Sequence, residues 1–398
     1  MSLNVPQPDE LARDSGPIKL DAAEMARVSI PLVEPFRISS GEVRVKESLL
    51  LRLREGDFTG WGESSAMSGS FYSVETPDSC QRELAEVLLP AVLGRRFTSL
   101  LDLDGLLSEL TSNRFARVAI ETAAWDLVAR RRSRPLHELL GLPRLPRIPC
   151  GLAIGLYNTE AELLAAIHRY WSNDYQRLKI KIKRGQDVSL VKAVRREFGE
   201  IPLFVDANAD YTRNDFRVFE QLDDFGLMMF EQPLAKGDLE GAAMLQRRVR
   251  TPTCLDESIE TLADARRAIE LGACKIVNIK LQRVGGFLEA LRIMQACAVH
   301  QIALWIGTMP ELGVGSAQAL PLTGHVGVAF PTDVEPSRRW YVDDVVDPEI
   351  QLHPGGLILP DEPGLGFEVD ETKVDKFAVS RWQFKSGGGG FGTPQVNA

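Results

Sequence analysis

Three acidic residues of this chain each follow a short apolar run of the kind that forms a buried strand. They are Asp206, Glu231 and Asp256, and successive acids lie 25 residues apart. Charged groups inside a protein are costly unless they are paired or bound to a metal. Three carboxylates at neighbouring strand ends could therefore hold one hard divalent cation, and oxygen ligands of this kind suit Mg²⁺. We expect Mg²⁺ at this site, with Mn²⁺ as the alternative.

Lysines precede these acids in the sequence. The run 177–183 reads Arg-Leu-Lys-Ile-Lys-Ile-Lys, so Lys179 and Lys181 share one face of a strand and the apolar residues share the other. If the apolar face packs against helices, the lysines point the opposite way. A second ammonium two residues away and a nearby cation both disfavour the charged form of a lysine. We therefore interpret Lys181 as a base and Lys179 as its electrostatic neighbour.

A further lysine follows the acids. Lys280 ends the strand-like run 275–280, four strands after the run that carries Lys181. In a barrel of eight strands these two strands lie opposite each other, so the two lysines would face a bound carbon atom from opposite sides. One lysine could remove a proton while the other returns one, which inverts the centre. The sequence thus predicts proton transfer at a carbon next to a carboxylate.

The elements that must position these residues alternate regularly from Ile148 onward. Short apolar strands are separated by amphipathic helices, a pattern that indicates parallel βαβ units. Eight such units fit a closed (β/α)₈ barrel, in which reactive side chains gather at the C-terminal ends of the strands. An open doubly wound sheet is the runner-up, but it would need a G-x-G-x-x-G motif after an early strand, and none follows the first two. The expected strands are 148–154, 177–182, 202–206, 227–230, 253–256, 275–280, 302–306 and 326–329.

The first part of the chain has a different pattern of apolar and polar residues. Stretches around 26–31 and 47–54 alternate as antiparallel strands do, and Gly60–Ser65 reads as a glycine-rich loop. Residues 77–141 have helical periodicity. We expect five segments along the chain: a flexible leader (1–16), an α+β domain (17–145), the barrel (146–349), a segment that folds back onto the α+β domain (350–385) and a flexible tail (386–398).

Composition excludes several classes of protein. The 398 residues are 44% apolar and 25% charged, with a formal net charge of −9. The basic clusters are short and scattered, which argues against a dedicated nucleic-acid-binding protein. No apolar run reaches the roughly 18 residues of a membrane span, and no secretory signal is visible. The five cysteines form no C-x-x-C pair, which argues against disulfides and structural zinc. We expect a cytoplasmic protein without nucleic-acid or membrane partners.

Other kinds of catalysis have less support. His300 and His325 each precede an expected strand, which is the wrong end of a barrel for a reactive group. No G-x-S-x-G motif is present, and Gly285–Gly286 lacks the lysine of a phosphate-binding loop.

Several short motifs of the chain resemble those of the enolase superfamily, and within it the muconate-lactonizing-enzyme subgroup. The branch of N-succinylamino acid racemases and o-succinylbenzoate synthases is the most similar, through Asn113–Arg117, Val205–Asn208 and Pro331–Asp333. The resemblance runs from about residue 18 to residue 382. The motifs that carry it are Lys179-Ile180-Lys181, Asp206-Ala207-Asn208, Glu231-Gln232-Pro233, Leu255-Asp256-Glu257-Ser258, Asn278-Ile279-Lys280 and Gly307-Thr308-Met309-Pro310-Glu311.

The resemblance implies a fold and a set of roles. The fold would be a (β/α)₈-type modified TIM barrel with an α+β N-terminal capping domain that the C-terminal segment completes. The three acids would be the metal ligands, and Lys181 and Lys280 the acid and base. Asn208, Glu257 and Asn278 would orient the ligands, and the loops Phe36–Ser40 and Ser68–Ser73 would close over the substrate. The implied substrate contacts are Phe36, Tyr72, Ala153, Asn208, Thr308, Met309 and Glu311.

The chain departs from the racemase branch at three positions that line the pocket in the family. Ala153 stands where a small polar residue is usual, and Thr308 and Pro310 replace a glycine and a branched aliphatic residue. The identity of the acyl group is therefore left open.

The function we expect is that of a Mg²⁺-dependent racemase or epimerase. It would abstract the α-proton of an N-acylamino acid-like carboxylate through an enolate, in a homo-oligomer. The alternatives are the dehydration that forms o-succinylbenzoate, the cycloisomerisation of a muconate, and a binding or scaffolding protein with a relic site.

Overall fold

A computed structural model of the chain describes residues 7–38, 41–69, 72–172 and 174–386. The expected tail lies outside these residues except for Ser386, as do Met1–Pro6 of the expected leader. Positions 39, 40, 70 and 71 of the two expected closing loops are likewise outside them. In the described ranges, no helix is both long and apolar enough to cross a membrane.

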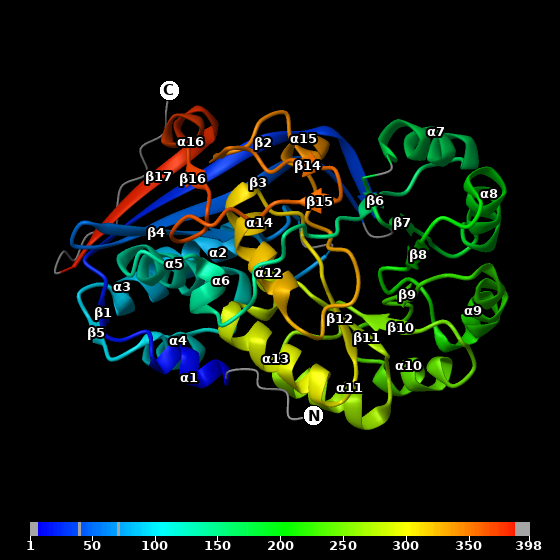
Figure 1. Cartoon of the computed structure of the whole chain (residues 1–398), viewed down its shortest axis with the longest axis horizontal. Coiled ribbons are helices and arrows are strands. Elements are labelled where there is room, and N and C mark those ends of the chain that lie inside the picture. The colour runs from blue at the N-terminus through cyan, green and yellow to red at the C-terminus, as the bar shows by residue number, and fades with distance from the viewer. Residues whose placement is uncertain (1–6, 39–40, 70–71, 173, 387–398) are drawn as a thin grey trace.

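An antiparallel sheet forms one end of the molecule. Its strands are β2 (Ala22–Ile38), β3 (Gly41–Glu55), β4 (Phe58–Ser64) and β17 (Ala378–Lys385), in the order β17-β2-β3-β4. Figure 1 shows the red C-terminal strand β17 lying along the blue strand β2, while helices α7 to α10 cover the side of the barrel that faces away from this sheet. The prediction that the C-terminal segment completes the capping domain is confirmed.

Strand β4 includes most of the segment that the sequence suggested as a glycine-rich loop. Helix α5 (Arg114–Arg131) packs closely on this strand. A Cβ atom at Gly60 would lie 2.2 Å from the carbonyl oxygen of Ala123, and one at Gly62 would lie 1.9 Å from that of Ala119. The glycines are therefore required by the close approach of a helix to a strand, and the prediction of a loop was wrong.

The remaining elements of the capping domain are short. Helix α1 (Pro8–Arg13) falls within the segment that we expected to be a flexible leader, and its Ala12 is fully buried. An ion pair between Asp9 and Arg292 of the barrel also holds this helix, with Nη2 and Oδ1 2.8 Å apart. The other elements are β1 (Ile18–Lys19), α2 (Pro77–Glu83), a π-helical turn (Leu84–Leu88), α3 (Leu89–Val92), β5 (Arg96–Phe97), α4 (Leu100–Leu110) and α6 (Leu136–Leu139).

Seven parallel strands form the barrel sheet in chain order. They are β6 (Leu152–Ile154), β7 (Leu178–Lys181), β8 (Leu203–Asp206), β9 (Phe230–Glu231), β10 (Thr253–Leu255), β11 (Ile276–Ile279) and β12 (Ala303–Ile306). The main helices after them are α7 (Glu160–Tyr170), α8 (Val188–Phe198), α9 (Phe216–Leu222), α10 (Leu239–Gln246), α11 (Leu262–Leu271), α12 (Leu281–Val284), α13 (Phe287–Val299) and α14 (Gly313–Ala319). The C-terminal part adds α15 (Ser337–Trp340), α16 (Glu371–Phe377) and the two-residue strands β13 (Val346–Asp347), β14 (Leu352–His353), β15 (Gly356–Leu357) and β16 (Glu368–Val369).

The eighth position of the barrel is closed by irregular chain. The expected strand over 326–329 is not formed. A single parallel bridge joins Val328 to Leu304 of β12, and another joins Thr332 to Cys150 just before β6. Pro331 separates the two bridges, and its missing N–H prevents a continuous ladder. The predicted (β/α)₈-type barrel is confirmed, with closure by these two bridges in place of a strand.

The inside of the barrel is layered. In parallel register, residues two apart on a strand face the same side. Two residues before the strand-end acids lies a separate buried apolar cluster, which we call the barrel floor. We call the charged residues at the carboxyl ends of the strands the barrel mouth; they are Lys179, Lys181, Asp206, Glu231, Asp256, Glu257, Lys280, Arg283 and Asp333. The floor consists of Phe204, Met229, Cys254, Ile276 and Trp305.

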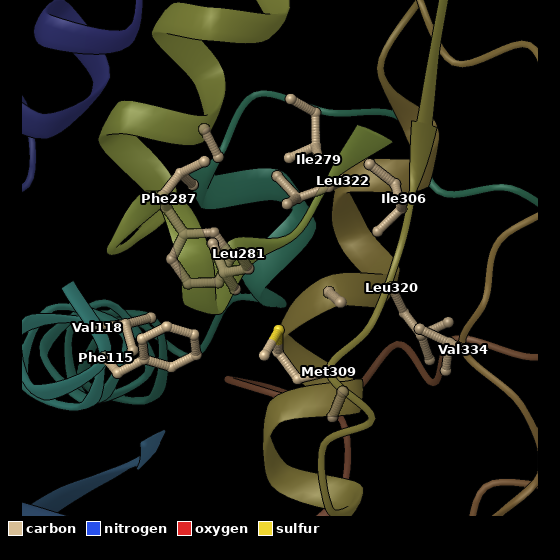
Figure 2. Close-up of a cluster of buried hydrophobic side chains, with 14 of the residues drawn as sticks. Phe115, Val118, Ile279, Leu281, Phe287, Ile306, Met309, Leu320, Leu322 and Val334 are labelled. Carbon is tan, nitrogen blue, oxygen red and sulfur yellow. The ribbon is translucent and has the colours of Figure 1, made fainter. Parts of the chain in front are cut away.

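The capping domain and the barrel share one hydrophobic core. Figure 2 shows Phe115 and Val118 of α5 in the same cluster as Leu281 and Phe287, which follow β11. A buried carboxylate of the capping domain also reaches a barrel helix. Glu121 accepts hydrogen bonds from the backbone of Phe287 and the next residue at the start of α13, at 2.9 and 3.1 Å. These contacts fix the segment that follows the predicted catalytic Lys280.

Candidate active site

The three predicted metal ligands lie at neighbouring strand ends. Asp206 and Glu231 are the last residues of β8 and β9 and are register partners, and Asp256 directly follows β10. All three side chains are completely buried. The regular spacing of the acids in the sequence thus corresponds to adjacent positions at the carboxyl edge of the barrel, where a parallel barrel presents its reactive groups.

The donor set suits a hard cation, but the carboxylates are turned toward cationic side chains. Oxygen Oε2 of Glu231 is buried and accepts no hydrogen bond within the described part of the chain, which leaves an oxygen that could bind a metal ion. Asp206 is paired with Lys181, and Asp256 with Lys280 and Arg283. In this arrangement no three acidic, histidine or cysteine side chains of the described residues are placed to hold a metal ion. The residue types fit a divalent metal; the carboxylates would have to exchange these ion-pair partners to bind it.

Lys179 and Lys181 of β7 both point into the barrel, as the alternation predicts. Their residues are only 4% and 6% exposed. Lys179 forms an ion pair with Asp333, and its Nζ lies 3.5 Å from Oε2 of Glu231. Burial lowers the pKa of Lys179, but Asp333, Glu231 and Asp206 outweigh burial and hold it above its usual value. Lys179 is therefore a fixed positive charge next to the acids.

Lys280 lies on the opposite side of the barrel mouth. Strands β7 and β11 are separated by three strands on one side, and by β12, the closing segment and β6 on the other. Nζ of Lys280 is 2.9 Å from Oδ2 of Asp256 and 2.8 Å from the hydroxyl of Tyr72. Burial lowers the pKa of Lys280, but Asp256 and Tyr72 outweigh it and raise this pKa well above the ordinary value.

The acids differ in their electrostatic surroundings. Burial raises the pKa of Asp256, but Arg283 and Lys280 outweigh it and lower this pKa to about 2. The pKa of Glu231 is raised well above its usual value by burial and by the nearby Asp206. The nearest cation to Glu231 is Nζ of Lys179 at 3.5 Å, whereas Asp206 and Asp256 each have a closer cation. Glu231 is therefore the carboxylate with the greatest need for a further positive charge.

Polar neighbours hold the acids in place. Asn278 donates a hydrogen bond from Nδ2 to Oε1 of Glu231 at 2.8 Å, and Asn208 donates to Glu257 at 3.1 Å. Asn208 has φ +41° and Gln232 has φ +36°, in the left-handed region that non-glycine residues seldom adopt. Oε1 of Gln232 accepts the backbone N–H of Asp256 at 2.9 Å. The turns with positive φ after β8 and β9 therefore carry side chains that contact the predicted metal ligands and their neighbours.

The predicted substrate contacts on the Lys181 side surround β6 and β7. The ring of Phe36, from β2 of the capping domain, lies 6.0 Å from Nζ of Lys181. Ala153 of β6 is the register partner of Lys179, and its N–H donates to Glu335 at 2.9 Å. Thr308 is half-buried, and its hydroxyl donates to the carbonyl oxygen of Asp333 at 3.3 Å.

The described contacts of Met309 and Glu311 do not include the lysines of the barrel mouth. Met309 is buried in the shared core, as Figure 2 shows. Glu311 accepts the N–H of Met309 at 3.1 Å, and burial next to Glu63 of the capping domain raises its pKa to about 7. The structure gives Glu311 contacts between the two domains and none with the strand-end acids.

Two charged residues of the site were not identified from the sequence. Arg283 of α12 pairs with Asp256 and donates to the hydroxyl of Tyr72. Asp333 lies in the closing segment and binds both Arg177 and Lys179. A signal existed for each, because Arg283 lies one helical turn after Lys280, and Asp333 is part of a motif that the resemblance used without assigning it a role.

Comparisons with known proteins agree with this architecture. Residues 22–141 match the family described as mandelate racemase / muconate lactonizing enzyme, N-terminal domain, and residues 162–373 match the enolase C-terminal domain-like family. The o-succinylbenzoate synthase of Geobacillus kaustophilus is 39% identical over 361 residues, which are 90% of this chain and 96% of that protein. The N-succinylamino acid racemase of Amycolatopsis sp is 42% identical over 365 residues, 92% of this chain and 99% of that protein.

Solved structures show the same fold. A member of the enolase superfamily from Listeria innocua superposes with a TM-score of 0.87 at 33% identity, over 92% of this chain and 99% of that one. Muconate lactonizing enzyme from Pseudomonas putida superposes with a TM-score of 0.83 at 25% identity, over 91% of this chain and 100% of that one. The chain belongs to the mandelate racemase and muconate lactonizing enzyme family of the enolase superfamily.

Proposed function

We propose that this protein is a Mg²⁺-dependent racemase that moves the α-proton of an N-acylamino acid-like carboxylate between Lys181 and Lys280. The observation that carries the proposal is the pair of buried lysines on opposite sides of a barrel mouth, with three buried carboxylates between them. A racemase needs one acid–base group on each face of the reacting carbon, and this arrangement supplies both.

Enzymes of this superfamily depend on a divalent metal. Asp206, Glu231 and Asp256 would hold it, and Mg²⁺ is the ion that three hard oxygen ligands favour, with Mn²⁺ as the alternative. When bound, the ion supplies positive charge that stabilises a substrate carboxylate and the negative charge that develops next to it. Lys179, held by Asp333, adds a fixed positive charge on the same side.

The two lysines carry the proton. In one direction the neutral amine of Lys181 takes the α-proton, and the ammonium of Lys280 gives a proton to the opposite face. In the other direction their roles reverse. Both residues are only 6% exposed, so bulk water is kept from the reacting carbon while the proton is in transfer.

Dehydration to o-succinylbenzoate is the second candidate. It is favoured by relatives of that name with 39% identity, such as the one from Bacillus subtilis over 91% of this chain. In this reaction one lysine is the base and the other stays charged as an electrostatic partner. The same residues would serve both reactions, so the choice depends on which substrate the pocket admits. A homo-oligomeric state and a cytoplasmic location belong to the same proposal.

A substrate panel tests the proposed function. The purified protein with Mg²⁺ is given N-succinyl and N-acetyl amino acids of both configurations, and the enantiomers are separated by chiral chromatography. The precursor of o-succinylbenzoate is tested in parallel for loss of water. We expect inversion of at least one N-acylamino acid; dehydration alone would favour the second candidate. If no substrate is inverted, dehydrated or exchanged at its α-carbon, the proposal is wrong.

A further inference from the structure

The two candidate acid–base lysines have different partners. Nζ of Lys181 pairs with Asp206 and faces the apolar ring of Phe36. Nζ of Lys280 pairs with Asp256 and also lies 2.8 Å from the hydroxyl of Tyr72. Within the part of the chain that the structure describes, Lys181 has no such hydroxyl partner. One flank of the site thus has an additional polar group that the other lacks.

The hydroxyl of Tyr72 is held firmly. Arg283 donates a hydrogen bond to it, and the guanidinium carbon of Arg283 lies 5.2 Å from the centre of the Tyr72 ring. Nζ of Lys280 lies at the same 5.2 Å from that ring. Oδ2 of Asp256 lies 3.4 Å from the hydroxyl and accepts a hydrogen bond from it. Two cations and one carboxylate therefore determine the position of a single phenol oxygen.

The chemistry of a phenol differs from that of the carboxylate beside it. Asp256 binds the ammonium form of Lys280 chiefly through its charge, and this attraction is lost when the amine is neutral. A hydroxyl both donates and accepts. The oxygen of Tyr72 can thus accept an N–H of Lys280 in both the ammonium and the amine form, which holds Nζ in place and leaves the lone pair of the amine free to take the α-proton.

The location of Tyr72 links this contact to the capping domain. Tyr72 follows β4 in the chain, whereas Lys280 and Arg283 come from the barrel. A cleft of about 410 Å³ lies beside this contact and is lined by Tyr72 and Arg283 among others. The side chain of Tyr72 is half-buried, lines this cleft and contacts Lys280 through its hydroxyl.

We propose that Tyr72 is a positioning residue for Lys280, whose hydroxyl directs the amine toward one face of the α-carbon. The inference rests on the proposed function and deepens it. The capping domain then contributes a hydrogen-bonding group at one of the two lysines and only the apolar ring of Phe36 at the other. A residue that only bound substrate would affect both transfers together.

The variant Tyr72→Phe tests this inference, because it removes the hydroxyl and keeps the ring. Exchange of the α-proton for deuterium is followed by proton NMR in D₂O, separately for each enantiomer of an N-acylamino acid that the wild type racemises. The variant Lys280→Ala identifies the enantiomer whose exchange needs Lys280. In Tyr72→Phe we expect exchange of that enantiomer to slow by about tenfold or more, and exchange of the other to change by less than about threefold.

Tyr157→Phe is the matched control. The hydroxyl of Tyr157 donates to Glu34 of the capping domain at 3.3 Å, so this variant also removes one phenol hydroxyl at the domain boundary. We expect it to leave both exchange rates unchanged, and melting temperatures to show that both variants fold.

Two outcomes would separate failure of this inference from failure of the proposed function. Equal slowing of both enantiomers in Tyr72→Phe, or no slowing of either, would overturn the role of Tyr72 alone. Exchange of neither enantiomer by the wild type, with any N-acylamino acid tested, would overturn the proposed function and the inference with it.

Discussion

The floor and the mouth of this barrel are built from the same strands and differ in nearly every physical property. The floor side chains Phe204, Met229 and Trp305 are fully buried and apolar. Two residues farther along the same strands, the mouth presents Asp206 and Glu231, which are just as deeply buried but charged. Because side chains alternate along a strand, one backbone can carry both layers. Packing in the floor stabilises the fold, and this stability offsets the cost of burying charges in the mouth.

The mouth contains several features that are unfavourable for stability. Lysines, an arginine and four acids are buried together, and turns with positive φ follow two of the strands. Each such feature is destabilising by itself and is retained at sites where function needs a fixed geometry. We therefore expect substitutions in the mouth to change chemistry more than stability, and substitutions in the floor to do the reverse.

The largest effect is expected for Asp206→Asn in the mouth. Loss of one metal-binding carboxylate should lower α-proton exchange by about 10³-fold or more, because metal-derived charge stabilisation is worth several kcal/mol. The melting temperature of the metal-free protein should change little. Titration calorimetry with Mg²⁺ and NMR exchange rates check both. Asp210→Asn, at a half-buried acid four residues on, is the control; equal losses in the two variants would contradict the distinction between mouth and surface.

The largest stability effect is expected in the floor. Phe204→Ala removes a fully buried ring that packs edge-to-face on Trp305, with ring centres 5.6 Å apart. The free energy of unfolding should fall by about 3–5 kcal/mol, the usual range for such a truncation. Urea denaturation measures it. Phe198→Ala, at the end of α8 outside the barrel, should lose less because that side chain is only half-buried. A loss below about 1 kcal/mol for Phe204→Ala would contradict the view that packing in the floor contributes substantially to stability.

A smaller, pH-dependent effect is expected for Glu257 in the mouth. Burial and the neighbouring Asp256 raise the pKa of Glu257 to about 7, against an ordinary value of 4.5. The folded protein then binds this proton more tightly than the unfolded chain, so the stabilisation is present at low pH and is lost as pH rises from 4.5 through about 7. Between pH 5 and pH 8 the metal-free wild type should lose more unfolding free energy than Glu257→Gln. Denaturation at both pH values measures the difference, and identical losses would contradict the assignment.

The sequence predicted those parts of the molecule that depend on local periodicity. Strand alternation placed Lys179 and Lys181 inside the barrel, and the regular spacing placed Asp206, Glu231 and Asp256 side by side. Features that depend on contacts between distant segments were missed. Gly60 and Gly62 indicated a loop because nothing local reveals that α5 packs on them.

The same reason explains the other differences. The closing segment pairs at one point with β12 and at another with the chain before β6, and no local pattern encodes such divided pairing. In the segment expected to be a flexible leader, α1 packs Ala12 into the core and pairs Asp9 with Arg292, and both contacts are with distant parts of the chain. Arg283 and Asp333 became part of the site only when the barrel brought them to Asp256 and Lys179.

The central claim, that Lys181 and Lys280 exchange the α-proton from opposite faces, is tested most directly by deuterium exchange with two variants. Lys181→Ala and Lys280→Ala are each incubated in D₂O with the separate enantiomers of an N-acylamino acid, and loss of the α-proton signal is followed by NMR. We predict complementary defects: each variant loses racemisation, and each retains exchange of only one enantiomer, a different one in each case. Exchange of both enantiomers at the native rate by either variant would contradict the account.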